Sequence, residues 1–461
     1  MSSLDPALDL FPLAASILAA VACGVLGNFL LLRRESLMGD AISHGVLPGL
    51  VIGFLLTGDR SPVTMLVGAT GAGIITVLLV MLVRRLGRVE PGAAMGVVFS
   101  ILFALGVLLI EQAAARQIDL DADCVLYGQL ETLAWYGAPV EWRETLAWAT
   151  LEAAPRQIWT LLTACVLSLG FTGVFFKELR IAAFDPGLAA ALGFRPRLIE
   201  LATTTLVAVA TVASFEAVGS ILVIAMLICP AATARLLTDR LSRQITWSVT
   251  IAVITATIGY RSATIVPGWF DRDSVNAAGS MTLVSGGILT LAVFFAPVHG
   301  VIARGWRRRG LARQVAIDDL IASLWRAEED DSRAIPVPRH ARTGDHFLTP
   351  AVVAAARRLG LVAGQSPTGV SLTDAGRDAA RDILRRHRLW ETYLVSEAGF
   401  APDHVHAAAE KLEHVVVRPP DGARLDPHGR SIPPASGDQD RMDDSKDSHR
   451  DHRSDPPSAP D

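Results

Sequence analysis

The sequence predicts an all-α polytopic membrane protein with a soluble C-terminal region. Of its 461 residues, 51% are apolar and 19% are charged, and the mean hydropathy is +0.38. Up to about residue 303, long apolar runs alternate with short charged breaks. Beyond this point no apolar run reaches the roughly 20 residues that a membrane-spanning helix needs. We therefore divide the chain into a transmembrane domain at 1–303, a soluble domain at 310–418 and a tail at 419–461.

About nine transmembrane helices are expected in the first domain. The second expected helix is short and rich in Gly and Pro, which indicates a broken or tilted helix. The first is expected to be a retained span, because the N-terminus lacks the basic segment of a cleavable signal peptide. The expected spans cover residues 10–32, 43–57, 62–83, 94–110, 158–176, 198–214, 216–237, 244–260 and 280–298.

Positive charge orients these spans, because basic residues concentrate in the loops that stay in the cytoplasm. Basic residues follow the first, third, fifth, seventh and ninth spans, whereas the N-terminus carries Asp5 and Asp9 and no base. This alternation predicts an outside N-terminus and a cytoplasmic C-terminal domain. The acidic connection at 111–157 then faces outward, either as an ordinary solvated loop or as a docking surface that attracts cations.

The membrane half contains two histidines, His44 and His299. His299 ends the last span and is expected to be interfacial. Asp40 and His44 are four residues apart, so on a helix they share one face. A carboxylate with an imidazole suits Mn²⁺, Fe²⁺ or Zn²⁺, and ionisable groups inside a bilayer usually face a pathway. The alternative is that both residues merely lie at a helix start, with Asp40 near the positive end of the helix dipole.

Three segments resemble the permease family of ATP-driven (ABC) importers for manganese, zinc and chelated iron. They are RRESLMGDAISHGVLPGLVIGFLLTG, the stretch from Ala183 to Leu241, and DLDADCVLYGQLE, which looks like the manganese/iron branch. The resemblance implies a bacterial inner-membrane permease with Asp40 and His44 on the ion path, and it favours Mn²⁺ over Zn²⁺ or Fe²⁺. It also implies three partners: a cytoplasmic ATPase, an external solute-binding protein, and a second permease that is identical or homologous.

ATP hydrolysis is expected on a separate chain. None of the three lysines follows a glycine, so the sequence lacks the G-x-x-x-x-G-K-[ST] phosphate loop of ATPases. This absence predicts that the chain is not itself an enzyme.

A short capped helix is expected between spans five and six. Asp185 is the N-cap, Pro186 the first helical position and Gly193 the stop. An ordinary connecting helix would have the same cap. In the resembled family this segment is the coupling helix that docks into the ATPase, which assigns coupling to Asp185, Pro186, Ala189, Leu192 and Gly193.

The soluble domain is expected to contain a helix, a second helix, a hairpin and a third helix, the order of a winged-helix unit. Glu410, Glu413 and His414 fall at i, i+3 and i+4 on one helix face, and His387 comes from the preceding long helix. Two histidines and two carboxylates with this spacing favour a metal site.

Residues 372–416 resemble the diphtheria-toxin-repressor group of manganese- and iron-dependent regulators, through LTDAGRDAARDILRRHRLWETYLV and HVHAAAEKLEHVV. That family also uses two acids from its first helix. If Asp319 matches the first acid, the second falls on Ala322. The expected recognition helix has few base-reading side chains besides Arg357 and Arg358, which argues against DNA binding. We expect a metal-sensing or dimerisation domain that holds regulatory Mn or Fe, with no tightly bound cofactor elsewhere.

Two other functions fit the sequence less well. A membrane-tethered metal-responsive regulator would need far fewer than nine spans as its anchor. An ATP-independent channel or carrier would need no ATPase partner. The tail at 419–461 is rich in Pro, Asp, Ser and Arg and is expected to be disordered.

Overall fold

A computed structural model describes residues 6–57, 62–114, 128, 130–133, 135, 154–269, 275–329, 342–343, 346–347, 349–364, 370–412, 414 and 424–433. The chain forms two compact units, Met1–Arg304 and Gly305–Asp461, and each is treated by itself below. Most of the acidic loop at 111–157 and most of the tail lie outside the described residues.

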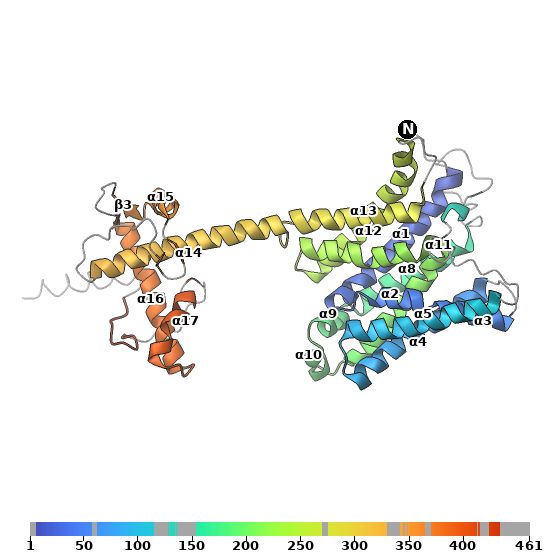
Figure 1. Cartoon of the computed structure of the whole chain (residues 1–461), viewed down its shortest axis with the longest axis horizontal. Coiled ribbons are helices and arrows are strands. Elements are labelled where there is room, and N and C mark those ends of the chain that lie inside the picture. Colours follow the sequence, from blue (N-terminus) through green and yellow to red (C-terminus); the bar gives the residue numbers. More distant parts are fainter. Residues whose placement is uncertain are drawn as a thin grey trace, which may run out of the picture. The chain divides into compact units, whose positions relative to one another are not determined.

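All the secondary structure described in the first unit is helical (Figure 1). Helices α3, α4 and α5 lie side by side, and α1 packs along α11. The helices are α1 (Pro6–Leu32), α2 (Met38–Gly45), α3 (Leu47–Thr57), α4 (Pro62–Gly87), α5 (Pro91–Ala114), α8 (Arg156–Val174), α9 (Phe176–Phe184), α10 (Pro186–Ala191), α11 (Pro196–Leu237), α12 (Leu241–Gly268) and α13 (Ala277–Phe295), with the 3-10 helix η1 (Leu130–Leu133).

Eight helices in the described part of the chain are long and apolar enough to cross a membrane. The longest, α11, has 42 residues. At 1.5 Å per residue a straight helix of this length would be about twice as long as the roughly 30 Å hydrocarbon core. Its backbone leaves helical geometry at Gly219, where φ is 74° and ψ is 164°, a conformation that glycine adopts readily. Helix α11 therefore contains the sixth and seventh of the nine expected spans.

The core of the first unit is built on close contact between α1 and α11. A Cβ atom on Gly27 would lie 1.8 Å from the Leu227 carbonyl oxygen, so only glycine lets the two backbones approach this closely. Buried polar side chains join α1 to α12 nearby. The Gln244 amide donates to Asn28 Oδ1 at 3.0 Å, and the Ser248 hydroxyl donates to the Gly24 carbonyl at 2.8 Å. These hydrogen bonds satisfy polar groups in a setting that excludes water.

The second unit has the helix, helix, hairpin and helix order that the sequence predicts, with one further two-stranded pair, β1–β2, between the first two helices. Ile317, Leu320, Ala356, Leu372 and Ile383 share its core. The elements are the C-terminal part of α14 (Val301–Glu329), β1 (Arg342–Thr343), β2 (His346–Phe347), α15 (Pro350–Arg358), β3 (Val362–Ala363), β4 (Ser371–Leu372), α16 (Asp374–Ser396), η3 (Pro402–His404) and α17 (His406–Leu412). Strands β3 and β4 are antiparallel, with Val362 opposite Leu372 and Ala363 opposite Ser371.

Residues 424–433 form a turn that is docked on α16, although the sequence places them in a disordered tail. Asp426 is 6% exposed, and its Oδ1 accepts the backbone N–H groups of His428 and Arg430 at 2.9 and 2.7 Å. Arg388 donates to the Ser431 carbonyl at 2.5 Å and Arg385 donates to the Pro433 carbonyl at 2.6 Å. A polar segment can thus be ordered by hydrogen bonds to arginines on a neighbouring helix, which composition does not reveal.

Candidate functional sites

Asp40 and His44 lie one helical turn apart on α2, and His44 Nε2 is 3.5 Å from Asp40 Oδ1. The two side chains are 41% and 30% exposed, although most other residues of α2 are buried. The His44 ring lies against Phe99 and Phe103 of α5, with centroids 4.9 and 5.5 Å away. The pair is therefore supported on one side by aromatic rings and accessible on the other.

Helix α2 is held tightly between its neighbours. A Cβ on Gly39 would lie 2.5 Å from Leu227 of α11, and a Cβ on Gly45 would lie 2.3 Å from the Thr76 hydroxyl of α4. The chain then breaks between α2 and α3 at Val46. Glycines thus let α2 sit deep in the helix bundle and fix the direction in which Asp40 and His44 point.

Two donor groups are fewer than the four or more that Mn²⁺, Fe²⁺ or Zn²⁺ take. Within the part of the chain that the structure describes, no third His, Cys, Asp or Glu joins Asp40 and His44 in a metal-sized cluster. A metal ion at this pair would need further ligands from water, backbone or another chain.

The α9–α10 segment has the local structure that the sequence predicts. Asp185 is the N-cap of α10, and its Oδ1 accepts the Leu188 N–H at 2.9 Å. Pro186 occupies the first helical position, and Gly193 has a φ of 84° just after the helix. Ala189 is buried, whereas Leu188 and Leu192 are 52% and 57% exposed. Exposed leucines beside a capped helix form an apolar contact surface.

Two other polar residues of the first unit have specific partners. His299 accepts or donates a 2.8 Å hydrogen bond with Asp239 Oδ1, which lowers the pKa of Asp239. Glu216 lies within α11, three residues before the break in helical geometry at Gly219. It pairs with Arg156 at 2.6 Å and accepts from Gln157 at 3.0 Å. These contacts assign Glu216 a structural ion pair.

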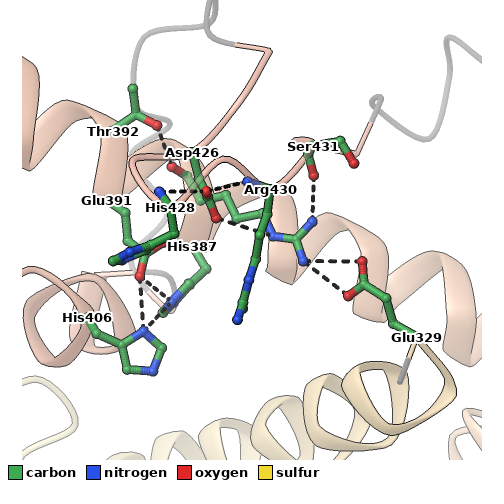
Figure 2. Close-up of polar contacts among 10 residues, drawn as sticks. Glu329, His387, Glu391, Thr392, His406, Asp426, His428, Arg430 and Ser431 are labelled. Carbon is green, nitrogen blue, oxygen red and sulfur yellow. Dashed lines mark hydrogen bonds and ion pairs between the residues drawn. The ribbon is translucent and has the colours of Figure 1, made fainter. Parts of the chain in front are cut away.

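The second unit contains a compact cluster of metal-ligand types, His387, Glu391 and His406 (Figure 2). Their ligand atoms all lie within 4.8 Å of one another. His387 Nε2 is 3.2 Å from Glu391 Oε1, and His406 Nδ1 is 3.0 Å from the same oxygen. His387 and Glu391 are 5% and 4% exposed and come from α16, whereas His406 is 64% exposed at the start of α17. Two imidazole nitrogens and a carboxylate oxygen at these distances fit a divalent transition metal.

The predicted ligand set is divided between two places. His387 joins Glu391 and His406, which the sequence analysis did not identify. His414 instead lies between two acids of α14, with Nδ1 3.4 Å from Asp318 Oδ2 and Nε2 3.3 Å from Asp319 Oδ1. The structure thus brings Asp319 to His414 as part of the predicted set, and it adds Asp318.

Glu410 is half-buried on α17, and Glu413 lies outside the described residues. The i, i+4 spacing of His387 and Glu391 on one helix is a signal that would have identified the first cluster.

Acid is expected to destabilise the metal-free second unit through Glu391. Burial raises the pKa of Glu391, but hydrogen bonds with His387 and His406 outweigh it and lower the pKa from 4.5 to about 2. A folded-state pKa below the unfolded value stabilises the fold above pH 4.5, and this stability is lost as pH falls towards 2. Urea unfolding of the Glu391→Gln variant should show a weaker pH dependence in this window than the wild-type chain. An identical pH dependence in both would contradict this assignment.

Each of the two units matches a family of known proteins. Residues 10–135 and 148–296 match the family described as "ABC 3 transport family". Residues 373–419 match the family described as "Iron dependent repressor, metal binding and dimerisation domain".

The first unit has relatives of known role and a similar solved structure. The manganese transport system membrane protein MntD of Bacillus subtilis is 37% identical over 304 residues, which cover 66% of this chain and 97% of that protein. The zinc transport system membrane protein TroD of Treponema pallidum is 35% identical, covering 67% of this chain and 80% of that protein. The solved structure of PsaBC from Streptococcus pneumoniae in complex with Fab is 27% identical, with a TM-score of 0.50 over 63% of this chain and 92% of that one.

Proposed function

The chain belongs to the ABC 3 transport family, and on this premise we propose that it is the permease of an ATP-driven importer of divalent metal ions, with Mn²⁺ as the preferred substrate. The observation that carries the proposal is the Asp40–His44 pair, accessible on one side of a tightly held helix in a multi-pass membrane protein. Manganese and zinc transport proteins among its relatives support this substrate class.

A second permease, identical or homologous, completes the ion path. Asp40 and His44 supply only two donors, and their exposed side faces away from the rings of α5. Donors from a facing subunit would fill the remaining coordination positions and enclose the ion. Alternating access would then move the ion past this pair from an external solute-binding protein to the cytoplasm.

Energy enters through the α9–α10 segment, which we assign as the docking site of a cytoplasmic ATPase subunit. Phe184, Leu188 and Leu192 are more than half exposed there, and an apolar surface of this kind indicates a protein partner. The Asp185 cap fixes the helix that presents these side chains. The chain itself supplies the path and not the hydrolysis of ATP.

The second unit is assigned as a cytoplasmic metal-sensing domain that adjusts import to the cytosolic metal concentration. His387, Glu391 and His406 would hold a regulatory Mn or Fe ion, with Asp318, Asp319 and His414 as a second acidic group. Arg357, near the end of α15, donates to the carbonyl of Gly364, which follows β3, so this arginine is engaged in the fold and less available for DNA. A metal ion in this unit would cross-link α16 and α17.

Uptake of ⁵⁴Mn²⁺ into right-side-out vesicles, with ATP sealed inside and the solute-binding protein added outside, tests the proposal. Vesicles that contain the chain, its second permease and the ATPase should accumulate ⁵⁴Mn²⁺ only with ATP, and Mn²⁺ should compete better than Zn²⁺ or Fe²⁺. Accumulation that needs no ATP would favour a channel or carrier. The absence of metal-dependent uptake, together with DNA retardation by the second unit, would favour the tethered regulator.

A further inference from the structure

Four charged side chains of the first unit form one ionic cluster, defined by Arg33, Glu35, Arg84 and Glu200. Arg84 Nη1 lies 2.5 Å from Glu35 Oε1 and 3.2 Å from Glu200 Oε1. Arg33 contacts the same two acids, with Nη2 3.0 Å from Glu200 and Nε 3.7 Å from Glu35 Oε2. Each base therefore contacts both acids, and the cluster carries no net charge.

The ionic cluster joins four elements that are far apart in the sequence. Arg33 follows α1, Glu35 precedes α2, Arg84 lies in the last turn of α4 and Glu200 in the first turns of α11. The Glu35 side chain is only 2% exposed, so removal of its partners would leave a buried charge uncompensated. The position of this carboxylate is thus set by ionic contacts with α1, α4 and α11 together.

Glu35 is also attached firmly to the helix that carries the ion-path pair. Its N–H donates to the Leu30 carbonyl at 2.8 Å, and its carbonyl accepts the Met38 N–H at the start of α2 at 2.9 Å. Asp40 lies five residues after Glu35, within the first turn of α2. Because the linker is this short and hydrogen-bonded at both ends, a displacement of Glu35 must displace α2.

The ionic cluster faces a cavity that the α9–α10 segment also lines. This cavity has a volume of about 280 Å³. All four residues of the cluster line it, and so do Ala183 and Pro186 of the α9–α10 segment. A movement of α10 therefore changes the space beside the charged side chains, without any need for direct contact between α10 and α2.

We propose that the ionic cluster is the mechanical link between the α9–α10 segment and α2, so that its four members are positioning residues for transport. The inference rests on the proposed function, because it needs an ATPase that acts at α10 and an ion that passes Asp40 and His44. Displacement of α10 would shift Arg84 and Glu200 on α4 and α11, and Glu35 would carry α2 with them. If the ionic cluster only stabilised the fold, mutation of its members would lower the stability of the protein but would not change the number of ions moved per ATP hydrolysed.

The test is the ratio of ⁵⁴Mn²⁺ uptake to ATP hydrolysis in right-side-out vesicles that contain the full chain, its second permease and the ATPase, with the solute-binding protein added outside. Arg84→Met removes the charge that bridges both acids. We expect uptake per ATP to fall by at least about tenfold, within the range of coupling energies between sites, while ATP hydrolysis stays within about twofold of wild type. Arg84→Lys should restore the ratio, since a single nitrogen of Arg84 makes both contacts and an ammonium can replace it.

Two further variants show whether a lower ratio comes from loss of the ionic cluster or from unfolding and nonspecific effects. Glu200→Gln changes a partly exposed member of the cluster and should lower the ratio as Arg84→Met does. Arg156→Met breaks the Arg156–Glu216 pair, which does not line this cavity, and should leave the ratio unchanged.

A parallel loss of uptake and hydrolysis, or an unchanged ratio in both Arg84→Met and Glu200→Gln, would overturn the inference. If the wild-type vesicles take up no Mn²⁺, Zn²⁺ or Fe²⁺, it is the proposed function that fails.

Discussion

Vesicles that contain the Asp40→Ala/His44→Ala variant are expected to lose ATP-driven ⁵⁴Mn²⁺ uptake by at least about 100-fold, because the variant removes both ligands that we propose on this subunit's side of the path. Loss of a residue that merely orients a metal ligand costs roughly 10- to 100-fold in metal affinity, so loss of two ligands should cost more. The side chains are partly exposed, so their truncation should leave the fold of α2 intact. Uptake is measured by filtration over a range of Mn²⁺ concentrations.

The chain offers a matched control for this variant. Asp239 and His299 are also an Asp–His pair, 2.8 Å apart, but they lie in the turns that follow α11 and α13. Asp239→Ala/His299→Ala removes the same two side-chain types away from α2 and should keep uptake near the wild-type rate. Normal transport by the Asp40→Ala/His44→Ala variant would reject the assigned ion path.

Addition of Mn²⁺ should raise the melting temperature of the isolated second unit, residues 305–461. At a free Mn²⁺ concentration about 100 times the Kd, a ligand that binds only the folded state adds about 2.7 kcal/mol, or roughly 8 °C for a domain of this size. His387→Ala and Glu391→Gln should each abolish most of this shift, because each removes one of the three side chains that we propose as metal ligands. Differential scanning fluorimetry with Mn²⁺, and with Mg²⁺ as a hard-cation comparison, measures it.

Two variants separate the possible origins of the shift. His404→Ala removes an exposed histidine paired with Asp403, two residues before His406, and should leave the shift unchanged. Asp318→Ala/Asp319→Ala removes the acids beside His414. Any change in the Mn²⁺-induced melting shift of this variant measures the contribution of the Asp318–Asp319–His414 group. A shift that survives in both His387→Ala and Glu391→Gln would show that the metal binds elsewhere. If the wild-type unit shows no shift, the sensing role is rejected.

The helical membrane fold could be predicted from the sequence because apolar runs and basic loops are direct consequences of the bilayer. The sequence predicts the boundary between the sixth and seventh spans at residue 215, four residues before Gly219, where α11 leaves helical geometry. The sequence does not predict that the helical geometry breaks inside the seventh expected span, nor that Glu216 pairs with Arg156. Both depend on which distant segments pack together, and periodicity carries no information about that.

Individual site residues were predictable to the extent that they are local. The Asp185 cap and the common face of Asp40 and His44 follow from spacing along one helix. The His387–Glu391–His406 cluster depends on how α17 folds back on α16, which spacing within α17 does not specify. The spacing of Glu410, Glu413 and His414 on one helix face predicts a different partner set for His387 from the one in the structure, where Glu391 and His406 lie beside it. The ionic cluster likewise joins residues up to 167 positions apart, from Arg33 to Glu200.

The most direct test of the central claim is a structure of the assembled importer with Mn²⁺, determined by cryo-electron microscopy in a nucleotide-free and a nucleotide-bound state. The claim is that Asp40 and His44 contact the travelling ion at the junction of two permease subunits. We predict metal density within coordination distance of Asp40 and His44, in a cavity that opens to opposite sides of the membrane in the two states. A pair that points into lipid, or that is sealed from every cavity at the subunit junction in both states, would contradict the account.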